Sequence, residues 1–332
     1  MKIPKLLFLL VIILILLLLP AFIKTRYIIH VLITAGLYVI LALSYDLSVG
    51  HLGDLSLGHP AFIGVGAYTA AILSRHYGMP FYISIIFAIV FSVLLAIAVG
   101  YPSFKLSAYA FSIATMGVAI VANSLARNWT RLTSGPMCVS QIPRPVLSLG
   151  NFSWTIDSLN DYYYTVIALA FLTYFLIRLI LRSRVGRTFI AVREDSLLAS
   201  ARGINPLKYR LLAFCTGAAF ASVVGVINAY YSTVVCPTEF SFYYTINLLF
   251  MVFIGGSGSL NGVVIGAIIF TIIPEALRMS PEYRLVIYGG ILIVMIINMP
   301  EGLQSLPAAF RRLRSSLKRS KIEKETKDVN LE

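Results

Sequence analysis

Apolar runs of about 20 residues follow one another along most of the chain, and this recurring length constrains the fold more than any other feature. A helix needs about 20 apolar residues to cross the hydrocarbon core of a bilayer. Of the 332 residues, 58% are hydrophobic and only 12% are charged, whereas soluble domains carry about 25% charged residues. The sequence therefore predicts a membrane protein of many spans. It excludes a soluble enzyme, a disordered chain and a nucleic-acid-binding domain.

We expect an all-α polytopic fold with about ten transmembrane helices, some of them broken by glycine. The predicted spans are 6–23, 28–45, 57–73, 82–100, 106–126, 162–180, 209–231, 243–255, 262–278 and 284–299. The first run follows Lys2 and Lys5, so it also fits a signal peptide. It continues through Pro20 without an A-x-A cleavage pattern, which favours a retained helix.

The distribution of positive charge predicts the orientation of these spans. With the N-terminus inside, 19 of the 27 Lys and Arg residues fall on the inner side, in agreement with the positive-inside rule. Both termini are then cytoplasmic. We divide the chain into a transmembrane domain, 1–310, and a basic cytoplasmic tail, 311–332, that is expected to lie on the membrane surface. The domain includes an outer loop, 127–161, and an inner loop, 181–208.

Two glycine-rich stretches interrupt the apolar pattern. The first, 50–68, contains five glycines and Pro60 where a helix should start, and it suggests either a backbone break beside a substrate path or close helix packing. The second, 255–266, does not match a nucleotide-binding loop, because Asn261 occupies the position of the third glycine. Its Gly258, Gly262 and Gly266 are spaced for one helix face.

A ladder of small residues in the seventh predicted span has a clearer structural meaning. Small side chains at every fourth position allow a neighbouring helix to approach closely. The ladder consists of Ala213, Gly217, Ala221, Gly225 and Ala229.

Isolated polar residues give little indication of chemistry. Asp46, His51, Asp54 and His59 lie near the second and third spans, but their spacing is not that of metal ligands, and the two aspartates fall near the inner interface, where water is close. The chain has no phosphate-binding loop, no nucleophile–base pair and no cofactor motif. We expect no catalytic residues, no metal and no enzyme activity.

The inner loop contains a short amphipathic helix, which we place at 188–202 and which Gly203 and Pro206 end. A compact helix between two spans suits a contact with a soluble partner. A plain basic surface loop is the alternative explanation.

Three stretches together resemble the M-type (LivM-like) permease subunit of branched-chain amino acid ABC importers. The resemblance covers roughly 28–303 and rests on three blocks in the expected order. The blocks are Gly53-Asp-Leu-Ser-Leu-Gly-His-Pro-Ala-Phe with Gly66-Ala-Tyr-Thr69, then Gly186-Arg187 with Arg193-Glu-Asp195, Ala199 and Gly203-Ile-Asn205, then Gly255-Gly256-x-Gly258-x-Leu260-x-Gly262.

The resemblance implies a permease subunit in the cell (inner or plasma) membrane, with no cofactor of its own. A periplasmic or extracellular solute-binding protein would deliver the substrate to this subunit and to a second, H-type permease subunit. Two cytoplasmic ATPases would bind ATP and Mg²⁺ and drive transport. The stretch 193–204 matches the coupling element that contacts an ATPase. The coupling residues are Arg193, Glu194, Asp195, Ala199, Gly203 and Ile204, and the substrate-path candidates are Asp54, Ser56, Gly58, His59, Gly64, Gly66, Gly256 and Gly258.

The sequence departs from the family pattern at Asp54, where glutamine is usual, at Pro60 and at Glu301. Related permeases carry urea, amides or other amino acids, and these substrates remain alternatives. A stand-alone secondary transporter or channel is a different class; it needs an ion-coupling carboxylate in the membrane and no coupling helix.

The three cysteines are too few for a disulfide framework. Cys138 and Cys236 both fall on the outer side, but no feature of the sequence brings them together. We therefore predict free thiols.

Overall fold

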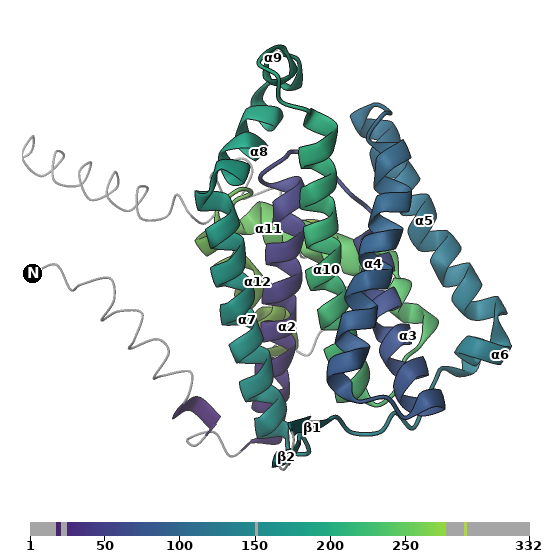
Figure 1. Cartoon of the computed structure of the whole chain (residues 1–332). Coiled ribbons are helices and arrows are strands. Elements are labelled where there is room, and N and C mark those ends of the chain that lie inside the picture. Colours follow the sequence, from purple (N-terminus) through teal and green to yellow (C-terminus); the bar gives the residue numbers. More distant parts are fainter. Residues whose placement is uncertain (1–17, 21–24, 150–151, 277–288, 291–332) are drawn as a thin grey trace, which may run out of the picture.

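The structure is a computed structural model that describes residues 18–20, 25–149, 152–276 and 289–290. It is a bundle of long helices with a small β-hairpin at one end and two short helices, α8 and α9, at the other (Figure 1). In chain order the elements are α2 (Arg26–Val49), α3 (His59–Tyr77), α4 (Phe81–Ser103), α5 (Ala108–Asn128), α6 (Thr130–Thr133), η1 (Gly135–Met137), β1 (Val146–Leu149), β2 (Phe152–Thr155), α7 (Leu159–Arg182), α8 (Arg184–Glu194), α9 (Ser196–Ala201), α10 (Pro206–Ser232), η2 (Pro237–Phe240), α11 (Phe242–Gly255) and α12 (Leu260–Ala276).

Eight of the predicted spans coincide with helices, which confirms the all-helical membrane architecture. Five of these helices, α2, α4, α5, α7 and α10, are long and apolar enough to cross a membrane, and α11 and α12 are shorter apolar helices. The predicted spans 6–23 and 284–299 lie outside the described residues, apart from 18–20 and 289–290. The number of ten spans therefore stays a prediction.

Helix starts follow from local sequence signals. Ser158 caps α7 in a reciprocal box with Asp161, in which each side chain accepts a hydrogen bond from the other residue's backbone N–H. Pro60 and Pro206 occupy the first turns of α3 and α10, where their missing N–H groups cost nothing. These signals define where the three helices begin.

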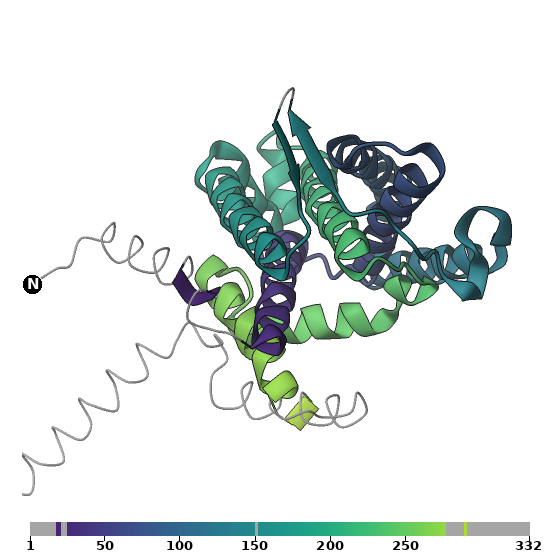
Figure 2. The same cartoon turned by 90° about the horizontal axis from the view of Figure 1, so that it is seen from below.

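Helix α2 is the central element of the bundle. Most of its residues are buried, and it packs against α7, α10, α11 and α12. Figure 2, which looks along the bundle, shows α2 in purple with these helices around it.

The small-residue ladder of α10 packs as predicted. All five of its members are buried. A Cβ at Gly217 would lie 2.9 Å from the carbonyl oxygen of Ser44 in α2, and one at Gly225 would overlap the backbone of Ile63 in α3. The ladder therefore lets α2 and α3 approach α10 at backbone contact. The glycine series near α12 differs from the prediction: Gly258 lies in the turn before that helix, and only Gly262 and Gly266 pack from the helix itself.

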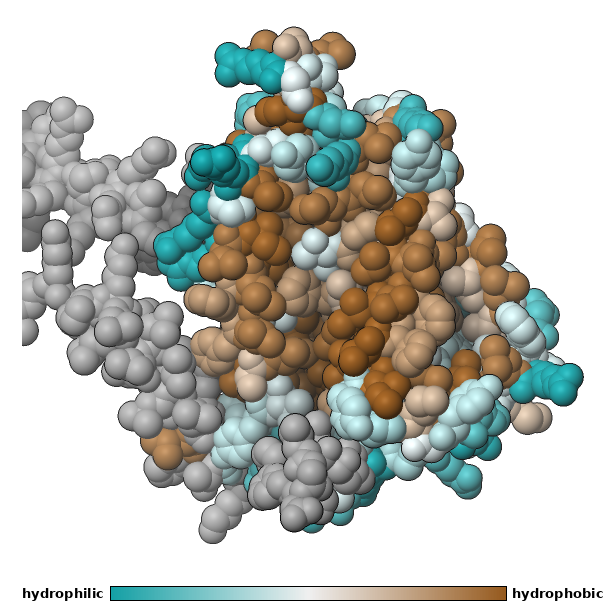
Figure 3. Space-filling view, viewed as in Figure 1, coloured by the Kyte–Doolittle hydropathy of each residue, from teal (hydrophilic) through white to brown (hydrophobic). Residues whose placement is uncertain are grey.

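On the face shown in Figure 3, apolar residues cover the middle of the bundle, whereas hydrophilic residues gather toward its two ends. Helix α4 contributes a row of exposed apolar side chains to the outside of the bundle. They are Tyr82, Ile86, Phe87, Val90, Phe91, Leu94 and Ile97. Exposed apolar side chains along a long helix are typical of a lipid-facing surface.

The prediction of free thiols at Cys138 and Cys236 is wrong, because the structure joins them in a disulfide with their Cα atoms 4.4 Å apart. The segment after η1 runs across to the segment after α10, and Val139 and Val235 exchange backbone hydrogen bonds of 2.8 and 2.9 Å. This pairing aligns the two cysteines. It joins segments 98 residues apart in the chain, so no local pattern could reveal it.

Candidate functional site at the α8 end of the bundle

Three segments from distant parts of the chain meet at the α8 end of the bundle. They are the α2–α3 loop, the turn before α12 and the last turn of α8. The Arg193 guanidinium of α8 donates a hydrogen bond to the carbonyl oxygen of Gly50. The backbone N–H of Gly258 donates to the Asp46 carboxylate at 2.9 Å. We refer to Asp46, Gly50, Arg193 and Gly258 as the α8 junction.

Glycine is required at two positions of this junction. Gly258 has a φ of +83°, which side chains other than glycine rarely adopt. A Cβ at Gly50 would overlap the Asp46 carboxylate and would lie 2.5 Å from the Gly258 nitrogen. The two backbones can therefore approach each other only because neither residue has a side chain.

Asp46 is buried more deeply than the sequence indicated. Its side chain is fully buried, and its second carboxylate oxygen has no hydrogen bond among the described residues. His51 lies 3.1 Å from that oxygen but is not aligned to donate to it. Asp46 thus attaches the end of α2 to the turn before α12 through Gly258.

Asp54 is buried as well, so the expectation that water is close to both aspartates is wrong. Its carboxylate lies 3.3 Å from Nε of Arg210 at the start of α10. Burial raises the pKa of Asp54 to about 6, although the positive charge of Arg210 opposes this change. The Asp54 carboxylate is therefore desolvated, and its partner cation, Arg210, belongs to α10.

The predicted coupling helix is two helices rather than one. We expected a single helix over 188–202, but α8 ends at Glu194 and α9 begins at Ser196. Asp195 separates them, because its carboxylate accepts hydrogen bonds from the backbone of Leu197 and Leu198 at 2.8 and 2.9 Å. An aspartate in this position starts a new helix instead of continuing the old one.

The remaining coupling candidates lie on or just after α9, which forms the tip of the bundle (Figure 1). Ala199 is buried, and the N–H of Ile204 donates to its carbonyl oxygen at 3.1 Å. Gly203 has a φ of +81° and open space around it. Leu197 and Leu198 are 80% and 55% exposed, so the tip presents apolar side chains outward.

The substrate-path candidates separate into two groups. Ser56, Gly58 and His59 are buried where the α2–α3 loop enters α3, and the His59 ring lies 2.9 Å from the Ser44 hydroxyl. Gly256, with a φ of +106°, ends α11 close to Gly258. These residues lie near the α8 junction, together with Asp54.

Gly64 and Gly66 lie further along α3, away from the junction. A Cβ at Gly64 would overlap the Phe240 ring, and one at Gly66 would overlap the Ser222 backbone of α10. This geometry gives both glycines a packing role. Their position on a substrate path stays a prediction.

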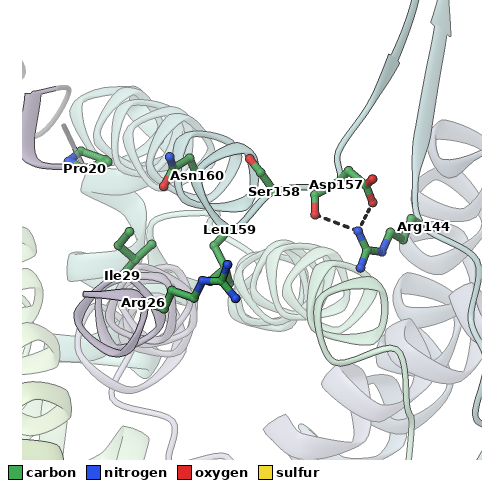
Figure 4. Close-up of a pocket in the computed structure, with 8 residues that line it drawn as sticks. All are labelled: Pro20, Arg26, Ile29, Arg144, Asp157, Ser158, Leu159 and Asn160. Atoms are coloured by element: carbon green, nitrogen blue, oxygen red, sulfur yellow. Dashed lines mark hydrogen bonds and ion pairs between the residues drawn. The ribbon is translucent and has the colours of Figure 1, made fainter. Parts of the chain in front are cut away.

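Two hollows open at the opposite, β1–β2 end. One, of about 590 Å³, lies where the starts of α2 and α7 meet the segments that flank the hairpin (Figure 4). There Arg144 donates to the backbone carbonyl oxygen of Asp157 at 2.9 Å and also to its carboxylate. The other, of about 400 Å³, lies between α2, α10 and α11.

Sequence reasoning missed two parts of these sites. In the sequence Arg210 is one of the many positive charges of the inner side, and only the structure shows that it faces Asp54. Glu239 was not considered at all, although it is an acidic residue in an otherwise apolar stretch and accepts hydrogen bonds from Asn228 and Tyr244. Across the described residues, no group of three or more His, Cys, Asp or Glu side chains is placed to hold a metal ion.

Comparison with known proteins adds independent information. The family model described as branched-chain amino acid transport system, permease component, matches residues 27–296. The high-affinity branched-chain amino acid transport system permease protein LivM of Escherichia coli (strain K12) is 32% identical over 286 residues, which cover 80% of this chain and 67% of that protein.

The corresponding permease protein LivH of the same organism is 28% identical over 297 residues, covering 81% of this chain and 92% of LivH. Among solved structures, PsaBC from Streptococcus pneumoniae in complex with Fab aligns with a TM-score of 0.44 and 18% identity, covering 84% of this chain and 94% of that chain. A structural likeness of this degree is too weak to indicate a shared function.

Proposed function

This chain belongs to the family of branched-chain amino acid transport system permease components, and from this premise we propose that it is the M-type permease subunit of an ABC importer for branched-chain amino acids. It is a membrane transport subunit rather than an enzyme. Its residues 1–310 form the permease domain, with the outer loop 127–161 and the inner loop 181–208, and 311–332 form a cytoplasmic tail.

The proposal includes the partners that such an importer requires. A solute-binding protein delivers the amino acid at the β1–β2 end, and an H-type permease subunit completes the path. Two cytoplasmic ATPases, which bind ATP and Mg²⁺, press on the α8–α9 end. Both termini of the chain lie in the cytoplasm, where the positive-inside rule places them.

The α8 junction is the observation that carries this proposal. The exposed Leu197 and Leu198 give an ATPase an apolar surface on which to dock. Motion of α9 passes to α8 through the tight Asp195 connection. Arg193 then transfers it to Gly50, because the guanidinium holds that carbonyl directly.

From Gly50 the motion reaches the ends of α2 and α12. Asp46 and Gly258 join these two ends by a hydrogen bond. The path candidates Asp54, Ser56, Gly58, His59, Gly256 and Gly258 occupy the same loops. The residues that line the inner mouth of the path would therefore move whenever the coupling helices move.

Reconstitution of the whole importer tests the function. Liposomes that contain both permeases and both ATPases, with the binding protein outside and ATP inside, should concentrate L-leucine, L-isoleucine or L-valine. Urea, amides and other amino acids, offered as competitors, report an alternative substrate. Liposomes with this chain alone should show no concentrative uptake. Uptake by the single chain driven by a proton or sodium gradient would identify a secondary transporter instead.

A further inference from the structure

The hollow between α2, α10 and α11 has two chemically different walls. Leu37, Leu41, Ile63 and Val224 make one part apolar. Thr34, Asn228 and Tyr244 make another part polar. His30 and Leu41 of α2 both line the hollow and are eleven residues apart. The hollow therefore extends about 16 Å along α2 from the β1–β2 end. We call it the α2–α10 crevice.

Glu239 stands directly behind the polar wall. Nδ2 of Asn228 donates to its two carboxylate oxygens at 3.3 and 3.2 Å, and the Tyr244 hydroxyl donates at 3.4 Å. Within the described residues, no Lys, Arg or His nitrogen lies within ion-pair distance of this carboxylate. Burial raises the pKa of Glu239, against the lowering effect of its two hydrogen-bond donors. The negative charge thus has neutral partners only.

The segment that carries Glu239 is held firmly in place. The Cys138–Cys236 disulfide fixes its start, and Nδ2 of Asn123 donates to the Pro237 carbonyl oxygen at 2.8 Å. Phe240, the next residue after Glu239, is buried and stacks on Tyr68 with ring centroids 5.6 Å apart. The carboxylate is therefore presented to the crevice wall by a rigid support rather than by a free loop.

These hydrogen bonds determine what the wall offers to a ligand. Asn228 and Tyr244 each give a hydrogen to Glu239, so the amide oxygen of Asn228 and the lone pairs of the Tyr244 hydroxyl are left to act as acceptors. Two acceptors with a negative charge behind them attract a cation that has several N–H donors. A primary ammonium group has this chemistry.

We propose that the α2–α10 crevice binds an aliphatic amino acid in transit, with its ammonium group at Asn228 and Tyr244 and its side chain against Leu37, Leu41, Ile63 and Val224. Glu239 is the positioning residue that orients the two acceptors and supplies the charge. The volume of about 400 Å³ falls within the range of small-molecule sites. This inference rests on the proposed function for the substrate class and goes beyond it by assigning a binding site within the chain.

Chemical modification of the crevice tests the proposal without relying on transport. Thr34→Cys places a thiol in the polar part of the wall, and Cys215→Ser removes the described free cysteine. The reconstituted complex is treated with a trimethylammonium-ethyl thiosulfonate reagent or with its uncharged ethyl analogue. The cationic reagent should react about tenfold faster than the neutral one, since a charged cleft concentrates counter-ions. Isopentylamine and L-leucine should protect the thiol, whereas 4-methylpentanoate, which lacks the ammonium group, should not.

A charge-neutral variant and a matched control identify the responsible carboxylate. Glu239→Gln should remove most of the preference for the cationic reagent and the protection by isopentylamine. Asp157→Asn removes an exposed carboxylate at the same end of the bundle and should leave both unchanged. Tyr244→Phe, which deletes one acceptor but keeps the charge, should weaken protection while the reagent preference remains.

The outcomes separate this inference from the proposed function. Equal reaction rates for the two reagents, or protection by 4-methylpentanoate as good as that by isopentylamine, would overturn the ammonium site even if the complex transports L-leucine normally. If the complex fails to transport L-leucine but isopentylamine still protects the thiol through Glu239, the site stands and its substrate is another aliphatic amine.

Discussion

At the scale of single residues, the contact of greatest consequence is that between Arg193 and Gly50. A hydrogen bond from a charged donor contributes about 1.5–3 kcal/mol, and this one connects α8 to the end of the central helix. Arg187 lies on the same helix and is exposed, and among the described residues its guanidinium donates only to the nearby Arg182 carbonyl oxygen. The two arginines therefore form a natural pair for comparison.

We expect Arg193→Gln to uncouple the importer. ATP hydrolysis in the reconstituted complex should persist while L-leucine uptake falls about tenfold or more, because the loss of roughly 1.5–3 kcal/mol weakens the connection between α8 and the loops. Arg187→Gln should leave both rates near those of the wild type. Equal effects of the two substitutions would mean that Arg193 acts only as a surface charge.

Asp54 makes a pH-dependent contribution to stability. Its pKa of about 6 in the folded chain exceeds the ordinary value of 3.8, so the folded state binds more protons between these values. The contribution of Asp54 is therefore most favourable below about pH 4 and declines as the pH rises through 6. We expect Asp54→Asn to flatten the curve of thermal midpoint against pH between about 4 and 6. An unchanged slope would show that the carboxylate is solvated.

The sequence identified Asp54, Arg193 and Gly258 one by one but did not place them together. Asp54 is 156 residues from its cation, Arg210, and Gly258 is 212 residues from Asp46. Such contacts depend on how helices pack, and the spacing of residues along the chain carries no information about them. The glycine-rich stretches 50–68 and 255–266 could be recognised from the sequence, because glycines are unusually frequent in them.

At the scale of elements, α3 and α10 are in contact at backbone distance. A Cβ added at Gly66 would overlap the Ser222 backbone, whereas a Cβ added at Gly117 of α5 would have no neighbouring atom within 4 Å. These two glycines permit a direct test of packing against path-lining, the two alternatives that the sequence left open.

Gly66→Leu should prevent stable folding, because overpacking of this kind costs at least about 1–3 kcal/mol. Gly117→Leu should be tolerated. Detergent-stable yield and monodispersity of the purified chain measure both effects. A well-folded Gly66→Leu protein that assembles but does not transport would instead place Gly66 on the substrate path.

The turn after α9 depends on backbone conformation rather than on space. Gly203 has a φ of +81° with nothing within 4 Å, and Gly78, at the far end of α3, has a φ of +60° and is equally unobstructed. A valine at either position meets the same left-handed strain of about 1–2 kcal/mol. Only Gly203 adjoins the coupling helices.

Gly203→Val should therefore uncouple ATP hydrolysis from uptake, while Gly78→Val should lower stability by a similar amount and leave coupling intact. Thermal midpoints and the ratio of substrate transported to ATP hydrolysed distinguish these effects. Normal coupling in the Gly203→Val complex would remove the turn from the mechanism.

The long helices were the part of the fold that the sequence predicted well, since spans of apolar residues have few alternatives in a bilayer. The break between α8 and α9 was missed, because the amphipathic pattern continues through Asp195 and only the capping geometry shows the interruption. The ends of short helices depend on single capping side chains, and a periodic hydrophobic pattern does not resolve individual residues.

At the scale of the whole molecule, orientation in the membrane is open to direct measurement. From the positive-inside rule we predict that both termini and the α8–α9 end lie in the cytoplasm. In intact cells, a cysteine introduced at exposed Arg187 of α8 should resist membrane-impermeant labelling until the membrane is opened, and so should a tag at the C-terminus. A cysteine at exposed Asp157, near the hairpin, should be labelled at once. Reversed results would invert the topology.

The disulfide between Cys138 and Cys236 has a consequence for how the chain is made. Such bonds form in oxidising compartments and rarely in the cytosol, so the bond can close only after the connections that carry both cysteines have been translocated to the same side. A chain inserted into the bilayer in the opposite orientation would keep both cysteines as thiols. The cross-link thus records that the two connections crossed the membrane to the same, oxidising side.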